Sequence, residues 1–249
     1  MTSSDLWPRE TAERYDTEES ANSTPEALGP VLDLLAELAD GGRALEFAIG
    51  TGRVGVPLLT DRGVPVAGIE YSEHMAAVLR RKIDEARLPV VLGDMATATA
   101  PDAGRYSLVY LVYNTISNLL TQEEQVACFR NAARHLAPGG RFLIELGVPP
   151  LRLLPPTQTA VPFDVSEHHL GLDTVDPAAQ LLTSHHLTRD ERTGAYRRTA
   201  SHHRYAWPAE LDLMAQLAGL TLESRHADWD RTPFTGDSPK HLSIWRKPA

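Results

Sequence analysis

The residues of this sequence whose types and spacing could do chemistry are a group of glycines and three acids. Gly50, Gly52 and Gly55 form a G-x-G-x-x-G pattern after the apolar run 44–49. Glycines let a ligand approach the backbone closely, and the N–H groups of a following helix N-terminus attract polar ligands. Dinucleotide-binding folds use such a loop, but a single pattern of this kind is a weak signal, so its context must decide.

Carboxylates around the loop indicate which nucleotide it holds. Glu46 lies four residues before Gly50, where an acid would repel a pyrophosphate but would suit a positively charged amino group. Glu70 follows twenty residues after Gly50, where a carboxylate can accept both hydroxyls of a ribose. Asp94, which precedes Met95, could accept from an adenine amino group beside an apolar side chain. The set favours a nucleoside with a charged end over a dinucleotide.

The elements that must position these residues follow from hydrophobic periodicity. Strands are predicted at 44–49, 64–71, 88–94, 106–113 and 141–146, with helices at 25–40, 51–63, 72–86 and 122–140. Strict alternation of strand and helix implies parallel strands covered by helices on both faces, a doubly wound α/β sheet. Ligands of such sheets bind beyond the carboxyl ends of the strands, where the loop and the acids would meet.

The C-terminal part completes this sheet after a segment of different character. A helix is predicted at 207–219 and strands at 221–230 and 240–247, which are too close in sequence for a helical crossover and should form an antiparallel hairpin at the sheet edge. Residues 150–206 contain a proline-rich connector and three predicted strands, the last two joined by the turn 191–194.

These patterns predict three parts of the chain. Residues 1–149 would hold N-terminal lid helices and the cofactor-binding core, and residues 207–249 would complete the core sheet. Residues 150–206 would be a small antiparallel β insertion that forms either a lid over the acceptor or a dimer face, so that a homodimer is possible.

Composition and charge exclude several classes. The 249 residues are 42% hydrophobic, enough for one large core with an insertion. Acids outnumber Lys plus Arg by 33 to 24, and no basic run could neutralise a phosphate backbone, so we expect no nucleic-acid partner. The first twenty residues are polar and acidic and no run of eighteen apolar residues occurs, so we expect a cytoplasmic protein without membrane contact.

Together these features resemble the class I S-adenosylmethionine-dependent methyltransferases of small-molecule type. The resemblance rests on E-F-A-I-G-T-G at 46–52, Glu70 followed by Y-S-E-H-M, G-D-M at 93–95 and H-L-A-P-G-G-R-F-L-I-E-L at 135–146. It implies a seven-stranded Rossmann-like sheet with an antiparallel last strand and S-adenosylmethionine as cofactor. The chain departs from the pattern at Ala48, where glycine is usual, and at Leu111, where a polar residue is often found.

Carried over residue by residue, the resemblance implies a cofactor site. Glu46, Ala48, Gly50 and Gly52 would surround the methionine end, Glu70 would accept from the ribose, Tyr71 and Met75 would lie beside the adenine, Gly93, Asp94 and Met95 would clamp it, and Leu111 would end the fourth strand nearby. No metal is expected.

Catalysis should need few residues. The sulfonium methyl group is reactive, so the enzyme mainly holds a nucleophile in line and excludes water. Tyr113 and Asn114 follow the fourth strand, and Tyr15 lies in a segment that resembles the tyrosine-bearing lid of small-molecule methyltransferases; these three are the candidate catalytic residues. The run Y-N-T-I-S differs from the Asn-Pro-Pro-Tyr signature of enzymes that methylate amide or nucleobase nitrogens, so those acceptors are disfavoured.

Histidine pairs recur at 168–169, 185–186 and 202–203 within the insertion. Adjacent residues of a strand point to opposite faces, so one histidine of a pair could act as a base or a metal ligand, or both could have surface or interface roles. The hairpin around the turn 191–194 would place His185 and His186 opposite Ala200 and Thr199 and not opposite the third pair, which argues against a metal cluster.

The sequence thus predicts transfer of a methyl group from S-adenosylmethionine to a nitrogen or oxygen of a small molecule, such as a sugar or a secondary-metabolite intermediate. Two alternatives remain open at this point. An NAD(P)-dependent oxidoreductase would share the glycine loop and Glu70, although Glu46 disfavours it. A non-catalytic S-adenosylmethionine-binding protein would share every cofactor residue.

Overall fold

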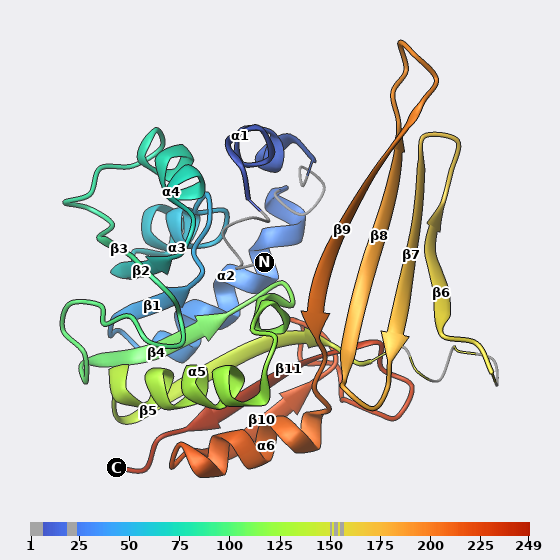
Figure 1. Ribbon diagram of the computed structural model, residues 1–249. Helices are drawn as coiled ribbons and strands as arrows, with labels where there is room; N and C mark the ends of the chain where they lie inside the picture. Colours follow the sequence, from blue (N-terminus) through green and yellow to red (C-terminus); the bar gives the residue numbers. More distant parts are fainter. Residues whose placement is uncertain (1–6, 19–23, 150, 152–153, 155–156) are drawn as a thin grey trace.

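The computed structural model describes residues 7–18, 24–149, 151, 154 and 157–249 (Figure 1). Its main sheet has seven strands in the order β10-β11-β5-β4-β1-β2-β3. Their bounds are β1 (Ala44–Phe47), β2 (Val66–Glu70), β3 (Val90–Leu92), β4 (Tyr106–Leu111), β5 (Leu136–Gly147), β10 (Thr221–His226) and β11 (Lys240–Arg246). The first five strands are parallel, and β11 runs antiparallel between β5 and β10. The predicted fold class is confirmed, including the antiparallel last strand.

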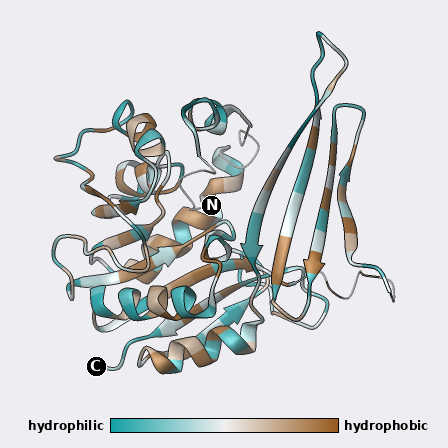
Figure 2. Cartoon of the chain, in the orientation of Figure 1, coloured by the Kyte–Doolittle hydropathy of each residue, from teal (hydrophilic) through white to brown (hydrophobic). Residues whose placement is uncertain are grey.

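Helices cover both faces of this sheet. Their bounds are α1 (Arg9–Glu18), α2 (Pro25–Ala39), α3 (Gly55–Arg62), α4 (Glu73–Arg80), the 3₁₀ helix η3 (Thr115–Asn118), α5 (Gln122–His135) and α6 (Pro208–Leu217). The apolar faces of α5 and α6 pack with one side of the sheet in one core cluster, and those of α2, α3 and α4 pack with the other side in a second. Figure 2 shows apolar residues concentrated along these packed elements.

Local signals explain where two of the helices begin. Thr24 caps α2 by accepting from the Ala27 N–H, and Pro25 occupies the first helical position. Thr121 and Glu124 form a reciprocal capping box at the start of α5. That helix ends at His135, and β5 begins at once, because the backbone is already extended at Leu136. The strand therefore starts five residues before the predicted boundary.

A second, four-stranded antiparallel sheet stands apart from the first. It contains β6 (Ala160–Val165), β7 (His169–Asp176), β8 (Leu181–Arg189) and β9 (Tyr196–Arg204), in chain order. We call it the insertion sheet. The prediction of three strands is wrong because the run 163–173 folds back on itself at Ser166, whose hydroxyl accepts from the His169 N–H. The predicted register is confirmed, with His185 opposite Ala200 and His186 opposite Thr199. Part of the predicted connector lies outside the described residues.

A buried polar network fastens the insertion sheet to the core. The Arg204 guanidinium, at the end of β9, donates to Gln125 of α5 at 2.6 Å, to Glu210 of α6 at 2.7 Å and to Gln180 at 2.9 Å. The Gln125 amide group in turn donates to the carbonyls of Ile116 and Leu119 beside η3 and to that of Arg204. Because both side chains are buried, this network fixes the insertion sheet relative to η3. Figure 1 shows the sheet projecting beside α1.

Candidate functional site

The loop between β1 and α3 contains the glycine pattern and lies at the carboxyl end of β1. Gly50 and Gly52 have positive φ values, as does Ala48 at +52°. The left-handed conformation at residue 48 explains why glycine is the usual residue there, since a Cβ is disfavoured in that region. Gly55 is required for another reason: a Cβ at this position would lie 2.6 Å from the Glu46 carboxylate. The glycines therefore shape the loop around Glu46.

Glu46 is buried in β1 and is 3% exposed. The Tyr110 hydroxyl, on the neighbouring strand β4, donates to its Oε2 at 2.9 Å. Burial raises the pKa of the Glu46 carboxyl to about 8, although the Tyr110 hydrogen bond and the charge of Arg53 act in the opposite direction. A cation placed beside Glu46 would favour the ionised carboxylate and lower this pKa.

Glu70 ends β2 and ties two loops together. Its Oε2 accepts from the Gly50 N–H and its Oε1 from the Ser72 N–H, both at 2.7 Å. Burial raises the pKa of Glu70 against these backbone hydrogen bonds. Each carboxylate oxygen keeps a second lone pair, so the side chain can still accept from ligand hydroxyls.

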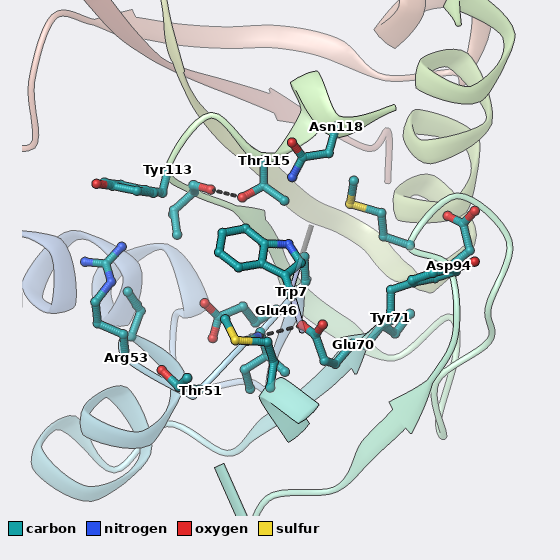
Figure 3. Close-up of a pocket in the computed structure, with 18 of the residues that line it drawn as sticks. Trp7, Glu46, Thr51, Arg53, Glu70, Tyr71, Asp94, Tyr113, Thr115 and Asn118 are labelled. Carbon is teal, nitrogen blue, oxygen red and sulfur yellow. Dashed lines mark hydrogen bonds between the residues drawn. The ribbon is translucent and has the colours of Figure 1, made fainter. Parts of the chain in front are cut away.

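Most of the predicted site residues line one cavity of about 850 Å³, part of it open to solvent. They come from α1 and from the carboxyl ends of β1, β2, β3 and β4: Tyr15, Glu46, Ala48, Gly50, Glu70, Tyr71, Met75, Gly93, Asp94, Met95 and Tyr113. Figure 3 shows Glu46, Glu70, Asp94 and Tyr113 around the same space. We call this the first cavity.

Three predicted residues do not line the first cavity. Leu111 is fully buried in the core cluster that contains α5, and the adjacent Val112 lines the cavity instead, because neighbouring strand residues point to opposite faces. Gly52 shapes the loop from behind, where a Cβ would lie 2.7 Å from Val56. The Asn114 side chain accepts from the Gly147 N–H at 2.6 Å and lines a separate hollow with Glu145.

The sequence prediction missed several lining residues. Trp7 precedes α1, Arg53 lies in the glycine loop with its guanidinium 5.0 Å from the centre of the Tyr113 ring, and Thr115 and Asn118 belong to η3. Of these residues, only Arg53 could have been predicted from the sequence, because it lies inside the glycine pattern. Trp7 and Asn118 lie far from the motif in sequence and reach the cavity only through tertiary packing.

Helix α1 is fastened directly onto the glycine loop. Asp16 accepts from the Thr51 hydroxyl at 2.6 Å and pairs with Lys82 at 2.7 Å, while Lys82 also donates to the Thr51 carbonyl at 2.8 Å. The Tyr15 and Trp7 rings contact each other edge to face, with centroids 5.4 Å apart. The helix therefore covers the cavity that the motif residues line.

This donor set fits a nucleoside that carries a positive charge. The two buried carboxyls of Glu46 and Glu70 and the half-buried Asp94 can accept from amino and hydroxyl groups, while Met75 and Met95 supply apolar surface for a base. A pyrophosphate would face the Glu46 side chain without a neutralising partner other than Arg53. The site therefore has the properties of an S-adenosylmethionine site.

Comparison with known proteins agrees with this interpretation of the site. Residues 44–140 match a family described as a methyltransferase domain. The CcbJ methyltransferase from Streptomyces caelestis is 38% identical, with a TM-score of 0.78 over 88% of this chain and 89% of that chain. The cypemycin N-terminal methyltransferase from a Streptomyces species is 28% identical over 82% of this chain and 83% of that protein. CalS10, an amino pentose methyltransferase from Micromonospora echinaspora solved with S-adenosylmethionine bound, has a TM-score of 0.69 at 19% identity over 89% of this chain and 90% of that chain.

The fold and the site together define a class I methyltransferase. The chain belongs to the methyltransferases, as its 38% identity to the CcbJ methyltransferase over most of both chains shows. S-adenosylmethionine is its cofactor, in agreement with the site and with the ligand-bound neighbours of the same fold. This family membership contradicts the oxidoreductase alternative. Within the part of the chain that the structure describes, no helix is long and apolar enough to cross a membrane.

Proposed function

We propose that the enzyme methylates an amine nitrogen of a small molecule that enters between α1 and the insertion sheet. The observation that carries this proposal is a second cavity in that position. It is lined by α1 and by polar residues of β8 and β9, including His186, Thr188, Thr199, Ser201 and His203, and it shares Trp7 and Asn118 with the first cavity. An acceptor in the second cavity would therefore adjoin the cofactor site.

The first cavity's residues would hold the cofactor as follows. Glu46 would pair with its amino group, directly or through water, Glu70 would accept from the ribose hydroxyls, and Asp94 with Met95 would bind the adenine. Tyr71 and Met75 would pack against the base. When bound, S-adenosylmethionine supplies a methyl group on a positively charged sulfur.

An amine suits the remaining geometry better than a hydroxyl does. A protonated amine needs only to lose one proton before its lone pair can attack, whereas a hydroxyl benefits from a strong base close to the methyl group. Tyr15 and Tyr113 line the first cavity and would shape the space around the transferred methyl group; Asn114 would support this from behind through Gly147. The name of the cypemycin relative specifies an N-terminus, which is also an amine.

A product assay tests this proposal. The purified protein is incubated with S-adenosylmethionine and, separately, with glucosamine, L-prolinamide, alanyl-alanine or catechol, and products are analysed by mass spectrometry. We expect the mass of a methyl group to be added to at least one of the amines and not to catechol. Methylation of catechol alone would replace the amine by a hydroxyl acceptor.

Three further expectations remain proposals. The acceptor lid role of the insertion sheet follows from the second cavity, whereas a dimer face would use the opposite side of the same sheet. A cytoplasmic location and the absence of nucleic-acid partners rest on the charge pattern of the sequence.

A further inference from the structure

An imidazole pair backed by a carboxylate lies beside the second cavity. Asp164 of β6 contacts His169 Nδ1 at 2.5 Å, and His169 Nε2 contacts His186 Nδ1 at 3.0 Å. The two imidazole rings stack with centroids 5.2 Å apart. Only His186 of these three residues lines the cavity.

The packing around this chain of residues fixes its geometry. The Phe163 ring lies against both imidazoles, 6.2 Å from His169 and 5.3 Å from His186 between ring centroids. Phe163 can lie there because residue 171 is glycine, whose absent Cβ would otherwise be 2.2 Å from the ring. A β-bulge between Pro162 and Asp164 turns Phe163 toward this face. The bulge and Gly171 thus both allow Phe163 to pack against the same two histidines.

The hydrogen bonds define the tautomers. A carboxylate can only accept, so His169 donates from Nδ1 to Asp164 and its neutral ring has a lone pair at Nε2. His186 then donates from Nδ1 to that nitrogen, and its own lone pair is at Nε2. No hydrogen bond among the described residues uses His186 Nε2. The arrangement leaves one basic nitrogen at the cavity.

We propose that His186 is the general base that deprotonates the acceptor amine, and that His169 and Asp164 are positioning residues that orient it. This inference rests on the proposed function. His186 Nε2 takes a proton from the acceptor ammonium. The freed nitrogen lone pair then bonds to the methyl carbon while the electrons of the carbon–sulfur bond stay on sulfur, and His186 returns its proton to solvent.

The charged groups around His186 come from several elements. His169 and Asp173 face it from β7, His185 is its neighbour on β8, Arg197 and His203 lie on β9, and Glu10 and Arg14 line the same cavity from α1. Burial, together with the charges of His169 and His185, lowers the pKa of His186, while Asp173 acts in the opposite direction. The base is therefore unprotonated at neutral pH, as this role requires.

The test compares His186→Gln with His202→Gln, whose ring contacts Thr183 on the opposite face of the sheet. Turnover is measured from pH 6 to 9 with the amine that the wild-type enzyme methylates fastest, alongside binding of S-adenosylhomocysteine and thermal unfolding. We expect His186→Gln to lower kcat about tenfold or more at pH 7, with recovery as the pH rises and the amine deprotonates unaided. Binding of S-adenosylhomocysteine should not change, and His202→Gln should behave as wild type.

Two further variants test the hydrogen-bonded chain Asp164–His169–His186, which we call the relay, separately from the base itself. His169→Gln and Asp164→Asn should shift the pH profile of kcat without changing binding of S-adenosylhomocysteine, and histidine ring ¹⁵N shifts should show that His169 and His186 titrate together in the wild type. Unchanged kcat at pH 7 in His186→Gln, or independent titration of the two rings, would overturn the inference. If the wild type methylates catechol and no amine, the proposed function itself fails, whereas the ¹⁵N result still decides whether His169 and His186 are coupled.

Discussion

The carboxyl group of Glu46 is buried, and this burial disfavours its ionised form. It is enclosed by the glycine loop, and its pKa of about 8 means that the unliganded protein holds a proton there at neutral pH. A ligand with a positive end would bind the ionised form, so cofactor binding should be coupled to loss of that proton. The positive end of the ligand would thus offset the cost of ionising a buried carboxyl.

Replacement of Glu46 tests this coupling. In wild type, calorimetric titration with S-adenosylmethionine at pH 7 should release a proton, visible as a binding enthalpy that depends on the ionisation enthalpy of the buffer. Glu46→Gln should abolish the release and weaken binding about 10- to 100-fold, as expected for loss of a charge-assisted hydrogen bond of about 1.5–3 kcal/mol. Buffer-independent enthalpies in the wild type would contradict the assignment of the proton to Glu46.

The same residue governs stability in the absence of ligand. A carboxyl whose folded pKa is about 8 and whose ordinary value is 4.5 holds more protons in the folded state between these values, so the free energy of unfolding falls as the pH rises through them. Glu46→Gln should remove this loss and raise the Tm at pH 9 relative to wild type by at least about 4 °C, with a smaller difference at pH 5. Glu191→Gln, in an exposed turn, is the matched control. Equal pH dependence in wild type and Glu46→Gln would refute the buried-proton account.

At the residue scale, the sequence was sufficient to predict that the three acids lie close together, because contact with one ligand would fix both their types and their spacing; their roles toward that ligand stay a prediction. Glu46, Glu70 and Asp94 all line the cavity. The Asn114 and Leu111 side chains do not line it: Asn114 accepts from the Gly147 N–H, and Leu111 lies in the core. Which side of a strand end faces a ligand depends on sheet geometry that local sequence does not encode.

Among the elements, α1 has few apolar anchors and depends on polar contacts to hold its position. Among the residues of α1 whose burial is described, Ala12 alone is buried, packed with Met75 and Val78 of α4. The Asp16 contacts to Thr51 and Lys82 add polar interactions. Helices with so little buried surface open readily. We infer that α1 closes on the cofactor.

Loosening this helix should affect binding more than stability. Asp16→Ala removes one hydrogen bond and one partly exposed ion pair, so S-adenosylhomocysteine should bind about two- to tenfold more weakly. Hydrogen exchange of residues 9–18 should be slowed by S-adenosylhomocysteine in the wild type and much less in Asp16→Ala. Glu13→Gln, exposed on the same helix, should match the wild type. Protection that persists in Asp16→Ala would show that these contacts do not hold α1.

Element prediction succeeded where periodicity is strong and failed at the insertion sheet. The alternating core strands and helices were recognisable because each buries a regular apolar face. The sequence predicts one strand over 163–173, since nothing in its alternation marks the reversal at Ser166. That reversal brings Asp164 next to His169, and the pairing of β7 with β8 brings His169 next to His186; the predicted hairpin of β8 and β9 could reveal neither contact.

Over the whole molecule, the Arg204 network transmits the position of the insertion sheet to η3 and so to both cavities. Arg204→Met would leave Glu210 and Gln125 without their partner in a buried setting and should lower the free energy of unfolding by roughly 3 kcal/mol. Turnover should fall further than S-adenosylhomocysteine affinity, because the second cavity depends on the insertion sheet. Arg198→Met, on the outward face, is the control; urea unfolding and initial rates provide the measurements. Equal losses of turnover and affinity would show that the network does not position the acceptor side.

Trp7 and Asn118 line both cavities. We expect this shared wall to set the order in which the cofactor and the acceptor bind and leave. The first cavity lies beneath α1, and an acceptor seated between α1 and the insertion sheet would block its mouth. S-adenosylmethionine must then arrive first and S-adenosylhomocysteine must leave last. Product-inhibition kinetics should therefore show S-adenosylhomocysteine competing with S-adenosylmethionine but not with the acceptor, so that an acceptor in excess traps the spent cofactor and slows the enzyme.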